Sequence, residues 1–352
     1  MSQTMTAIEA KFEAQKLAFG PFFFQAVVAM RELGVLDAIN SKRSGLTLDV
    51  LCDELNLTSY GLSVLLEAGM AANVIEKTAE DRYKLTKVGV FLRSDEMTSV
   101  NVNFTRDVCY DGLKYLKESV VKGEPAGLKV FGNYKTVYHA LAELSDDVRE
   151  SWFGFDHYYS TDSFPHALEV VFDSKIDKLL DIGGNTGKWT IKCCHHDSDV
   201  KITIADLPGQ IATAKQNLAP YDFLNRVSYH PCDMLEAETV LPKDHDVIWM
   251  SQFLDCFSSD EILAILGKVA EASDADTTIY IMESFWDNQQ YEAGSYSIVA
   301  LSLYFTCIAN GNSKMFKLDD LFPLIEQSGL EIVETYPLIG NTFNTLIKMR
   351  KA

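Results

Sequence analysis

The feature that most constrains this chain is an apolar segment that runs directly into a glycine-rich turn. Residues 179–187 read LLDIGGNTG, and Lys188–His195 follows with a pattern typical of a helix. Glycines at such a strand-to-helix turn let a ligand approach the backbone closely, and the start of the helix offers free N–H groups. Asn185 is compatible with a positive φ, because asparagine adopts the left-handed conformation more readily than most residues. The pattern predicts a ligand site at the end of a buried strand.

Short apolar segments alternate with helical segments through the C-terminal half of the chain. We predict strands at Lys178–Ile182, Lys201–Ala205, Arg226–His230, Asp246–Met250 and Thr278–Glu283, with helices between them that include Gln210–Asn217 and Asp260–Ala272. This alternation is typical of a mostly parallel, doubly wound α/β sheet. Two last strands, Glu331–Tyr336 and Asn344–Met349, follow the helix Leu318–Ser328. With no helix between them, we expect them to pair antiparallel.

The N-terminal part has a different pattern, in which helices precede a hairpin. We predict a helix over 21–40 that breaks near Gly34, then helices at Thr47–Leu55, with Thr47 as N-cap, and Ser59–Ala72. Short strands at Val74–Lys77 and Arg82–Leu85 complete a winged-helix order. Residues 101–170 are mostly helical. We therefore divide the chain into an N-terminal domain (1–100), a helical connector (101–170) and an α/β domain (171–352).

Charge and composition limit the partners of the chain. Its 352 residues include 31 Lys and Arg against 50 Asp and Glu, a net charge of −19, which disfavours binding to nucleic acid or to an anionic membrane. The predicted recognition helix, Ser59–Asn73, contains Glu67 and no Lys or Arg. The chain has no run of 18 apolar residues, its N-terminus does not resemble a signal peptide, and its seven cysteines are scattered. We expect a cytoplasmic protein with reduced thiols.

No metal site is expected. The strongest candidate is Cys193–His196 (CCHH), but neighbouring residues on a helix point about 100° apart. Tetrahedral metal sites use spaced pairs of ligands instead.

Three acids lie at the ends of consecutive predicted strands and point to the chemistry of the ligand. Asp206, after the second strand, is placed to accept ribose hydroxyls, and Asp233 with Met234, after the third, is placed to bind and pack an adenine ring. Asp181 precedes the first glycine, where a carboxylate would repel a pyrophosphate but attract an ammonium group. S-adenosylmethionine has an amino acid end and no phosphate, so it fits better than a nicotinamide dinucleotide. The alternative is that these acids only cap helices or lie on the surface.

These motifs resemble the class I S-adenosylmethionine (SAM)-dependent O-methyltransferases that carry an N-terminal winged-helix dimerisation domain, among them caffeate-type and bacterial polyketide enzymes. The resemblance rests on DIGGNTG and ADLPG and on four longer segments: AMRELGVLDA (29–38), LTLDVLCDEL (46–55), RYKLTKVGVFL (82–92) and FLDCFSSDEILAIL (253–266). It implies a Rossmann-like seven-stranded SAM-binding domain whose last strand is antiparallel, a homodimer, and a small-molecule methyl acceptor.

The resemblance also implies roles for individual residues. Gly183, Gly184 and Gly187 would surround the methionine part of SAM, and Phe257 stands where the family usually has an adenine-contacting tryptophan. Phe155 and Tyr159 match a segment between cofactor and acceptor. The full set of residues expected to bind the cofactor is Asp181, Gly183, Gly184, Gly187, Asp206, Leu207, Asp233, Met234, Ser251, Phe257 and Tyr159. Aromatic and apolar side chains that could line an acceptor pocket are Trp286, Tyr296, Tyr304, Phe305 and Ile308, although core packing explains each of them equally well.

The sequence departs from the family at the expected general base. Asp255 occupies the place of the family's histidine, and Ser313 the place of its supporting glutamate. A phenol has a pKa of about 10 and an aspartate one of about 3.9, so proton transfer between them is uphill by about 8 kcal/mol. Asp255 could serve as a desolvated base or as an orienting group, His157 could act instead, or proximity alone could suffice. The prediction is methyl transfer to a hydroxyl of a small aromatic or apolar compound. The alternatives are a SAM-binding dimer with altered or lost catalysis and, less favoured, a nicotinamide oxidoreductase.

Overall fold

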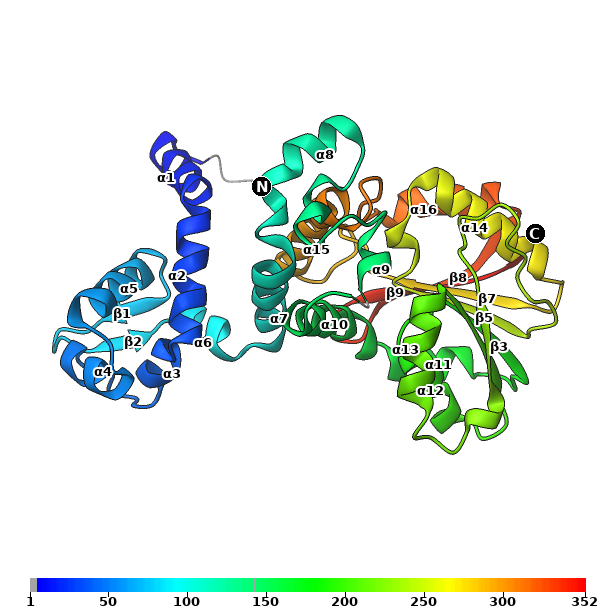
Figure 1. Cartoon of the computed structure of the whole chain (residues 1–352), viewed down its shortest axis with the longest axis horizontal. Helices are drawn as coiled ribbons and strands as arrows, with labels where there is room; N and C mark the ends of the chain where they lie inside the picture. The colour runs from blue at the N-terminus through cyan, green and yellow to red at the C-terminus, as the bar shows by residue number, and fades with distance from the viewer. Residues whose placement is uncertain (1–4, 142) are drawn as a thin grey trace. The chain divides into compact units, whose positions relative to one another are not determined.

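The computed structural model describes residues 5–141 and 143–352, which form two compact units (Figure 1). The first extends to Arg106 and the second spans Asp107–Ala352. This division falls close to the first predicted boundary, and most of the helical segment expected as a connector belongs to the second unit.

The first unit has the predicted order of helices followed by a hairpin. Its elements are α1 (Ala7–Ala18), α2 (Gly20–Glu32), α3 (Val35–Asn40), α4 (Leu48–Leu55), α5 (Ser59–Ala71), β1 (Ile75–Lys77), β2 (Tyr83–Leu85), α6 (Lys87–Ser94) and α7 (Glu96–Phe104). Gly34 has a φ of 72° and separates α2 from α3, which confirms the predicted break. Thr47 lies at the N-cap position of α4, but its side chain makes no capping hydrogen bond. The core is built from apolar side chains of α2 to α5 and the hairpin, including Met30, Leu36, Leu51 and Leu66.

Helix α1 was not expected from the sequence. Thr6 and Glu9 form a reciprocal capping box that fixes its start, with the Thr6 N–H donating to the Glu9 carboxylate at 2.8 Å. None of its residues is buried, and Ile8, Phe12 and Leu17 are exposed. Phe22 on α2 is also exposed. Propensity and capping therefore define this helix, because it has no apolar face packed on a core.

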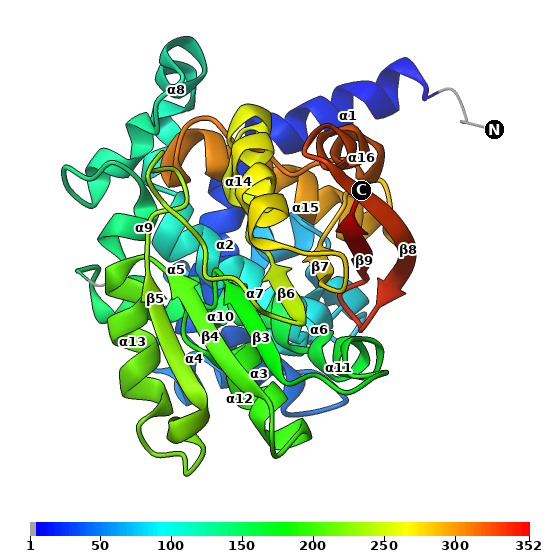
Figure 2. The same ribbon diagram turned by 90° about the vertical axis from the view of Figure 1, so that its right-hand side faces the viewer.

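The second unit is organised around a seven-stranded sheet with the order β5-β4-β3-β6-β7-β9-β8 (Figure 2). The strands are β3 (Lys178–Ile182), β4 (Lys201–Asp206), β5 (Val227–Pro231), β6 (Val247–Ser251), β7 (Thr278–Glu283), β8 (Leu330–Ile339) and β9 (Asn344–Lys351). The first five are parallel, and β9 pairs antiparallel with both β7 and β8. The Rossmann-like sheet and its antiparallel last strand are confirmed.

Helices cover both faces of this sheet, and the alternation of strand side chains explains why. Leu180 and Ile182 pack on the face covered by α14 (Ser259–Ala272) and α16 (Leu318–Gln327). Leu179 points to the other face, which is covered by α11 (Phe164–Val171), α12 (Lys188–His196) and α13 (Pro208–Leu218). The Trp189 and Trp249 rings stack there with their centroids 4.0 Å apart. Both faces are apolar, as expected for a buried parallel sheet.

The remaining helices of the second unit precede the sheet or follow β7. They are α8 (Leu116–Lys122), α9 (Val137–Ala140), α10 (Asp146–Thr161) and α15 (Glu292–Tyr304), with short 3₁₀ or π turns at Thr105–Cys109, Gly112–Tyr115, Ala126–Val130, Leu224–Arg226, Leu254–Cys256 and Phe305–Ala309. The stretch Glu292–Ala309 is the one helix of the described chain that is long and apolar enough to cross a membrane, although about a third of it is buried within the protein. Ile298, Tyr304 and Ile308 are among its buried side chains.

Candidate active site

The glycine turn that follows β3 has the left-handed backbone conformation that its sequence indicates. Gly183 and Gly187 have φ values of 73° and 82°, and Asn185 has a φ of 47°. A Cβ atom on Gly183 would lie 2.4 Å from the Phe253 ring, and one on Gly184 would lie 2.8 Å from the Ile204 side chain. The turn is therefore closely packed against the ends of the neighbouring strands and admits no larger residue at Gly183 or Gly184.

Asp206, the last residue of β4, is held beside this turn by two backbone N–H groups. Asn185 donates to its Oδ2 atom at 2.8 Å, and Leu207 donates to its Oδ1 atom at 2.7 Å. Burial raises the pKa of Asp206 to about 6, whereas the two hydrogen bonds act in the opposite direction. Each carboxylate oxygen keeps a second lone pair, so the group can accept a pair of ribose hydroxyls.

Asp181 lies underneath the turn rather than on its surface. Its side chain is 2% exposed, and Thr190 donates a hydrogen bond to its Oδ2 atom at 3.0 Å. Burial raises the pKa of Asp181 to about 7. A direct contact between Asp181 and the ammonium group of a cofactor therefore stays a prediction. What the structure shows for Asp181 is a bond to the first turn of α12.

The other residues expected around the cofactor lie at the ends of β5 and β6 and on α10. Asp233 accepts a hydrogen bond from the Leu235 N–H group at 2.9 Å, and Met234 is buried in the core beneath it. The Ser251 hydroxyl is buried without a hydrogen-bond partner in the described part of the chain. The Phe257 ring meets Phe253 edge to face, with centroids 4.9 Å apart. The buried Tyr159 ring packs against Phe155 at 4.7 Å.

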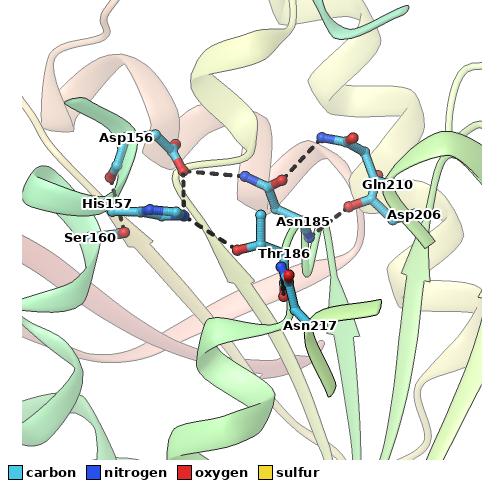
Figure 3. Close-up of polar contacts among 8 residues, drawn as sticks. All are labelled: Asp156, His157, Ser160, Asn185, Thr186, Asp206, Gln210 and Asn217. Carbon is cyan, nitrogen blue, oxygen red and sulfur yellow. Dashed lines mark hydrogen bonds and ion pairs between the residues drawn. The ribbon is translucent and has the colours of Figure 1, made fainter. Parts of the chain in front are cut away.

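Helix α10 is tied to the glycine turn by two neighbouring residues, as Figure 3 shows. The Asn185 amide donates to Asp156 Oδ2 at 3.2 Å and accepts from Gln210 Nε2 at 3.0 Å. The His157 ring nitrogen Nε2 lies 3.3 Å from the Thr186 hydroxyl. Asn185 thus joins α10, α13 and, through its backbone, the end of β4. The sequence indicates only a backbone role for Asn185.

His157 is poorly suited to act as a base. Burial, with a smaller contribution from the positive charge of Lys188, lowers its pKa to about 4. The imidazole is therefore neutral at physiological pH, and a conjugate acid this strong makes it a weak proton acceptor. Its ring faces Thr186 of the glycine turn.

Asp255 lies in the 3₁₀ turn after β6, where burial raises its pKa to about 6. Glu283, the last residue of β7, fixes this segment because its Oε1 atom accepts the N–H groups of Phe253 and Leu254, each at 2.9 Å. Glu283 itself is 3% exposed, and its Oε2 atom has no partner among the described residues. Burial and the charge of Asp255 hold the pKa of Glu283 well above its usual value.

Ser313 supports the same segment indirectly. Asn310 donates to the Ser313 hydroxyl at 2.8 Å and to the Cys256 carbonyl at 2.6 Å. Ser313, which stands in the family's glutamate position, is 3% exposed. Through Asn310 it helps to position the loop that carries Asp255.

Four residues of this site were missed or undervalued in the sequence. Burial and the nearby Asp255 charge raise the pKa of Asp156 to about 7, and the Tyr138 hydroxyl is buried beside the Cys256 thiol. Glu283 had a visible signal, because an acid ends an apolar strand. Asp156 also stood out as an acid within the aromatic segment WFGFDHYY. The side-chain role of Asn185 and the position of Tyr138 depend on tertiary contacts that have no local pattern.

The predicted acceptor-lining residues differ in their exposure to solvent. Tyr304, Phe305 and Ile308 are buried, and the Tyr304 hydroxyl accepts a hydrogen bond from Trp152 Nε1 at 2.8 Å. Tyr296 is 77% exposed. Trp286 packs under the Lys317 ammonium group, which lies 5.0 Å from its ring. Whether any of them contacts an acceptor stays a prediction.

The fold and the site together define a Rossmann-like domain of the SAM-binding methyltransferase class. A family model described as the O-methyltransferase domain matches residues 114–322, and a second one, the Dimerisation2-like domain, matches residues 11–83. Since the first match covers more than half of the chain, the protein belongs to the O-methyltransferase family.

Individual relatives agree with this assignment. The chain is 26% identical over 299 residues to the L-tyrosine C(3)-methyltransferase of Streptomyces lavendulae, covering 83% of this chain and 79% of the relative. It is 22% identical to the acetylserotonin O-methyltransferase of Gallus gallus over 72% of this chain and 74% of that one. Among solved structures, the SAM-dependent methyltransferase SibL has a TM-score of 0.73 at 20% identity, covering 96% of this chain and 98% of its own. The mitomycin 7-O-methyltransferase MmcR also reaches 0.73, at 19% identity, over 97% and 98% of the two chains.

The residues of the site fit the cofactor of this family. S-adenosyl-L-methionine is the methyl donor, and S-adenosyl-L-homocysteine is the product that remains. The carboxylate of Asp206 suits ribose hydroxyls, and the glycine turn offers backbone groups to the amino acid end. The protein is a SAM-dependent methyltransferase.

Proposed function

We propose that this enzyme methylates a hydroxyl group of a small aromatic acceptor, with Asp255 as the group that receives the hydroxyl proton. The observation that supports this proposal is the burial of Asp255, which stands where the family has its histidine and has a pKa of about 6. Bound SAM supplies an electrophilic methyl group on a sulfonium sulfur. The protein binds and orients the acceptor, and its carboxylate accepts the proton as the new bond to oxygen forms.

The raised pKa of Asp255 lowers the free-energy cost of proton transfer from the acceptor hydroxyl. Against a phenol with a pKa of about 10, a base with a pKa of about 6 faces an uphill step of about four units, or about 5.4 kcal/mol. An ordinary aspartate would face about 8 kcal/mol. A site that holds SAM and the acceptor in line can offset several kcal/mol of this remaining cost, because proton transfer then accompanies methyl transfer. Glu283 supports this role by holding the backbone before Asp255.

The experiment that tests the proposed function is a transfer assay with SAM carrying a ¹³C-labelled methyl group and a panel of phenols, catechols and naphthols. Calorimetric titrations with SAM and NADH accompany it. We expect SAM binding, no NADH binding, and a product whose ¹³C spectrum shows a methoxy group. A ring-methyl signal would move the reaction to carbon, as in the name of the Streptomyces lavendulae relative. SAM binding without any methylated product would instead favour a SAM-binding protein that has lost catalysis.

We also propose that the enzyme is a cytoplasmic homodimer that assembles through its first unit. The exposed apolar side chains Ile8, Phe12, Leu17 and Phe22 on α1 and α2 support this assembly, because such side chains are normally covered. The match to a Dimerisation2-like domain supports it too. The net charge of −19 argues against nucleic acid and anionic membranes as further partners.

A further inference from the structure

The loop that follows β5 is tied to the end of β4 beside Asp206. The Cys232 N–H group donates to the Asp206 carbonyl at 2.9 Å, which places Asp233 next to the residue whose carboxylate suits ribose hydroxyls. The Asp233 carboxylate accepts the Leu235 N–H group at 2.9 Å. An ionised carboxylate has about four lone-pair sites, so Asp233 can also accept a hydrogen bond from a ligand.

Buried side chains give this loop little support. Met234 and Leu241 are buried in the core, whereas Leu235 and Val240 are 38% and 71% exposed. Residues 232–240 form neither a helix nor a strand. A segment with few buried apolar contacts deforms easily. The position of the Asp233 carboxylate therefore depends on hydrogen bonds to the backbone of the loop.

Lys268 on α14 supplies two of these hydrogen bonds. Its ammonium group donates to the Met234 carbonyl at 2.8 Å and to the Glu236 carbonyl at 2.5 Å. The Met234 carbonyl and the Leu235 N–H group belong to one planar peptide unit. A charge-assisted hydrogen bond that fixes this carbonyl therefore also fixes the N–H group that holds Asp233.

The same helix begins on the other side of the expected adenine site. Ser258 and Glu261 form a capping box that fixes the start of α14, directly after Phe257, which is expected to contact adenine. Lys268 lies about three turns further along the helix. Because an α-helix is a stiff element, α14 holds Phe257 and the Asp233 loop at a defined separation.

We propose that Lys268 is a positioning residue for cofactor recognition, because it fixes the peptide between Met234 and Leu235 and so orients the Asp233 carboxylate toward the adenine amino group of SAM. This inference goes beyond the proposed function, which concerns the acceptor, and rests on the predicted contact between Asp233 and adenine. Adenine carries an amino donor where hypoxanthine carries a carbonyl oxygen. A carboxylate fixed in this position favours the donor and rejects the oxygen.

The test compares S-adenosylhomocysteine with S-inosylhomocysteine, which carries hypoxanthine in place of adenine, by calorimetric titration. We expect the unmodified protein to bind S-adenosylhomocysteine at least tenfold more tightly. In Lys268→Met, which keeps an unbranched stem without a donor, this ratio should fall at least threefold because S-adenosylhomocysteine loses affinity. Lys268→Arg, which keeps the charge and several donors, should retain the ratio. Glu271→Gln, at an exposed position of α14, is the control for a changed charge.

Two results would overturn the inference. One is an unchanged ratio in Lys268→Met, since equal weakening of both ligands would show only that Lys268 supports the fold. The other is equal binding of the two ligands by the unmodified protein, which would exclude Asp233 from adenine recognition. Lys268→Gln, which keeps one donor group, is judged by the same criterion if Lys268→Met does not fold. The methoxy product of the unmodified enzyme tests the proposed function separately, so either proposal can fail alone.

Discussion

At the scale of single residues, the site depends on carboxylates that burial makes harder to ionise. Asp156 and Asp181 have pKa values of about 7, and Asp206 and Asp255 have values of about 6. Each carboxylate accepts hydrogen bonds from a different set of donors, and these donors place the carboxylates at different positions around the glycine turn. Asp206 is held by backbone N–H groups beside the glycine turn, whereas Asp181 lies beneath the turn and accepts a hydrogen bond from Thr190.

Asp206 provides the most direct prediction about cofactor binding. We expect Asp206→Ala to weaken SAM binding by about 10-fold to 150-fold, because hydrogen bonds to a charged group contribute about 1.5–3 kcal/mol. Calorimetric titration measures this, with Asp199→Ala, at an exposed loop position, as the matched control. Equal SAM affinity in Asp206→Ala and Asp199→Ala would show that the carboxylate does not hold the ribose.

The raised pKa of Asp181 predicts how stability depends on pH. In the folded protein its pKa is about 7, above the value of about 3.9 in an unfolded chain, so the folded state binds more protons between these limits. This contribution to stability is complete below about pH 4 and is lost as the pH rises through about 7. Asp181→Asn removes it and can still accept from Thr190. Urea unfolding of the ligand-free protein at pH 5 and pH 8 should therefore show a smaller stability difference in Asp181→Asn than in the unmodified protein. An unchanged difference would mean that burial does not shift this group.

At the scale of elements, the sequence predicted the strands and helices of the sheet to within about two residues at most ends. It did so because the strands are short apolar segments and because glycine, proline and capping residues bound the helices. Helix α1 was missed because it buries no side chain and its few apolar residues, such as Ile8 and Phe12, are separated by charged ones. The two hydrogen bonds that join α10 to the turn were also missed, one donated by Asn185 to Asp156 and one between His157 and Thr186. Residues 29 positions apart meet there only through the packing of the whole unit.

The glycine turn gives a prediction at this scale. Gly183→Ala should destabilise the protein by about 1–3 kcal/mol and weaken SAM binding, because the residue combines a φ of 73° with a Cβ position 2.4 Å from Phe253. Gly209→Ala is the matched control, because its Cβ would meet nothing within 4 Å and it lies in helix α13. That change should leave SAM binding unaltered and stabilise the protein by about 0.5–1 kcal/mol. Thermal unfolding and SAM titration of both variants test the pair, and a Gly183→Ala protein that behaves like Gly209→Ala would contradict this account.

At the scale of the whole molecule, the chain combines a SAM-binding unit with an N-terminal unit whose first helix is exposed and carries the apolar side chains Ile8, Phe12 and Leu17. Family membership and the fold were predictable from motifs spread along the chain. The acceptor was not predictable, because the side chains around Asp255 come from elements that are distant in the sequence. The departure at Asp255 was visible in the sequence, but the burial that changes its chemistry was not.

The exposed face of α1 predicts the assembly. We expect Ile8→Glu together with Phe12→Glu to shift the protein from dimer to monomer, because two charges would have to be buried in the proposed interface. Light scattering coupled to size-exclusion chromatography measures the mass. Lys11→Glu, on the same exposed helix, is the control for added negative charge. A double variant that remains as dimeric as the control would exclude α1 from the interface.

The measurement that tests the central claim most directly is the pH dependence of methyl transfer at saturating SAM, in the unmodified enzyme and in Asp255→Asn. Because Asp255 must be ionised to accept a proton, and its pKa is about 6, the rate of the unmodified enzyme should rise about tenfold per pH unit below 6 and level off above it. Asp255→Asn should bind SAM normally, lose about 100-fold or more of the rate at pH 7.5, and no longer show this rise. An Asp255→Asn enzyme with the same rate and the same profile as the unmodified one would contradict the assignment of Asp255 as the proton acceptor.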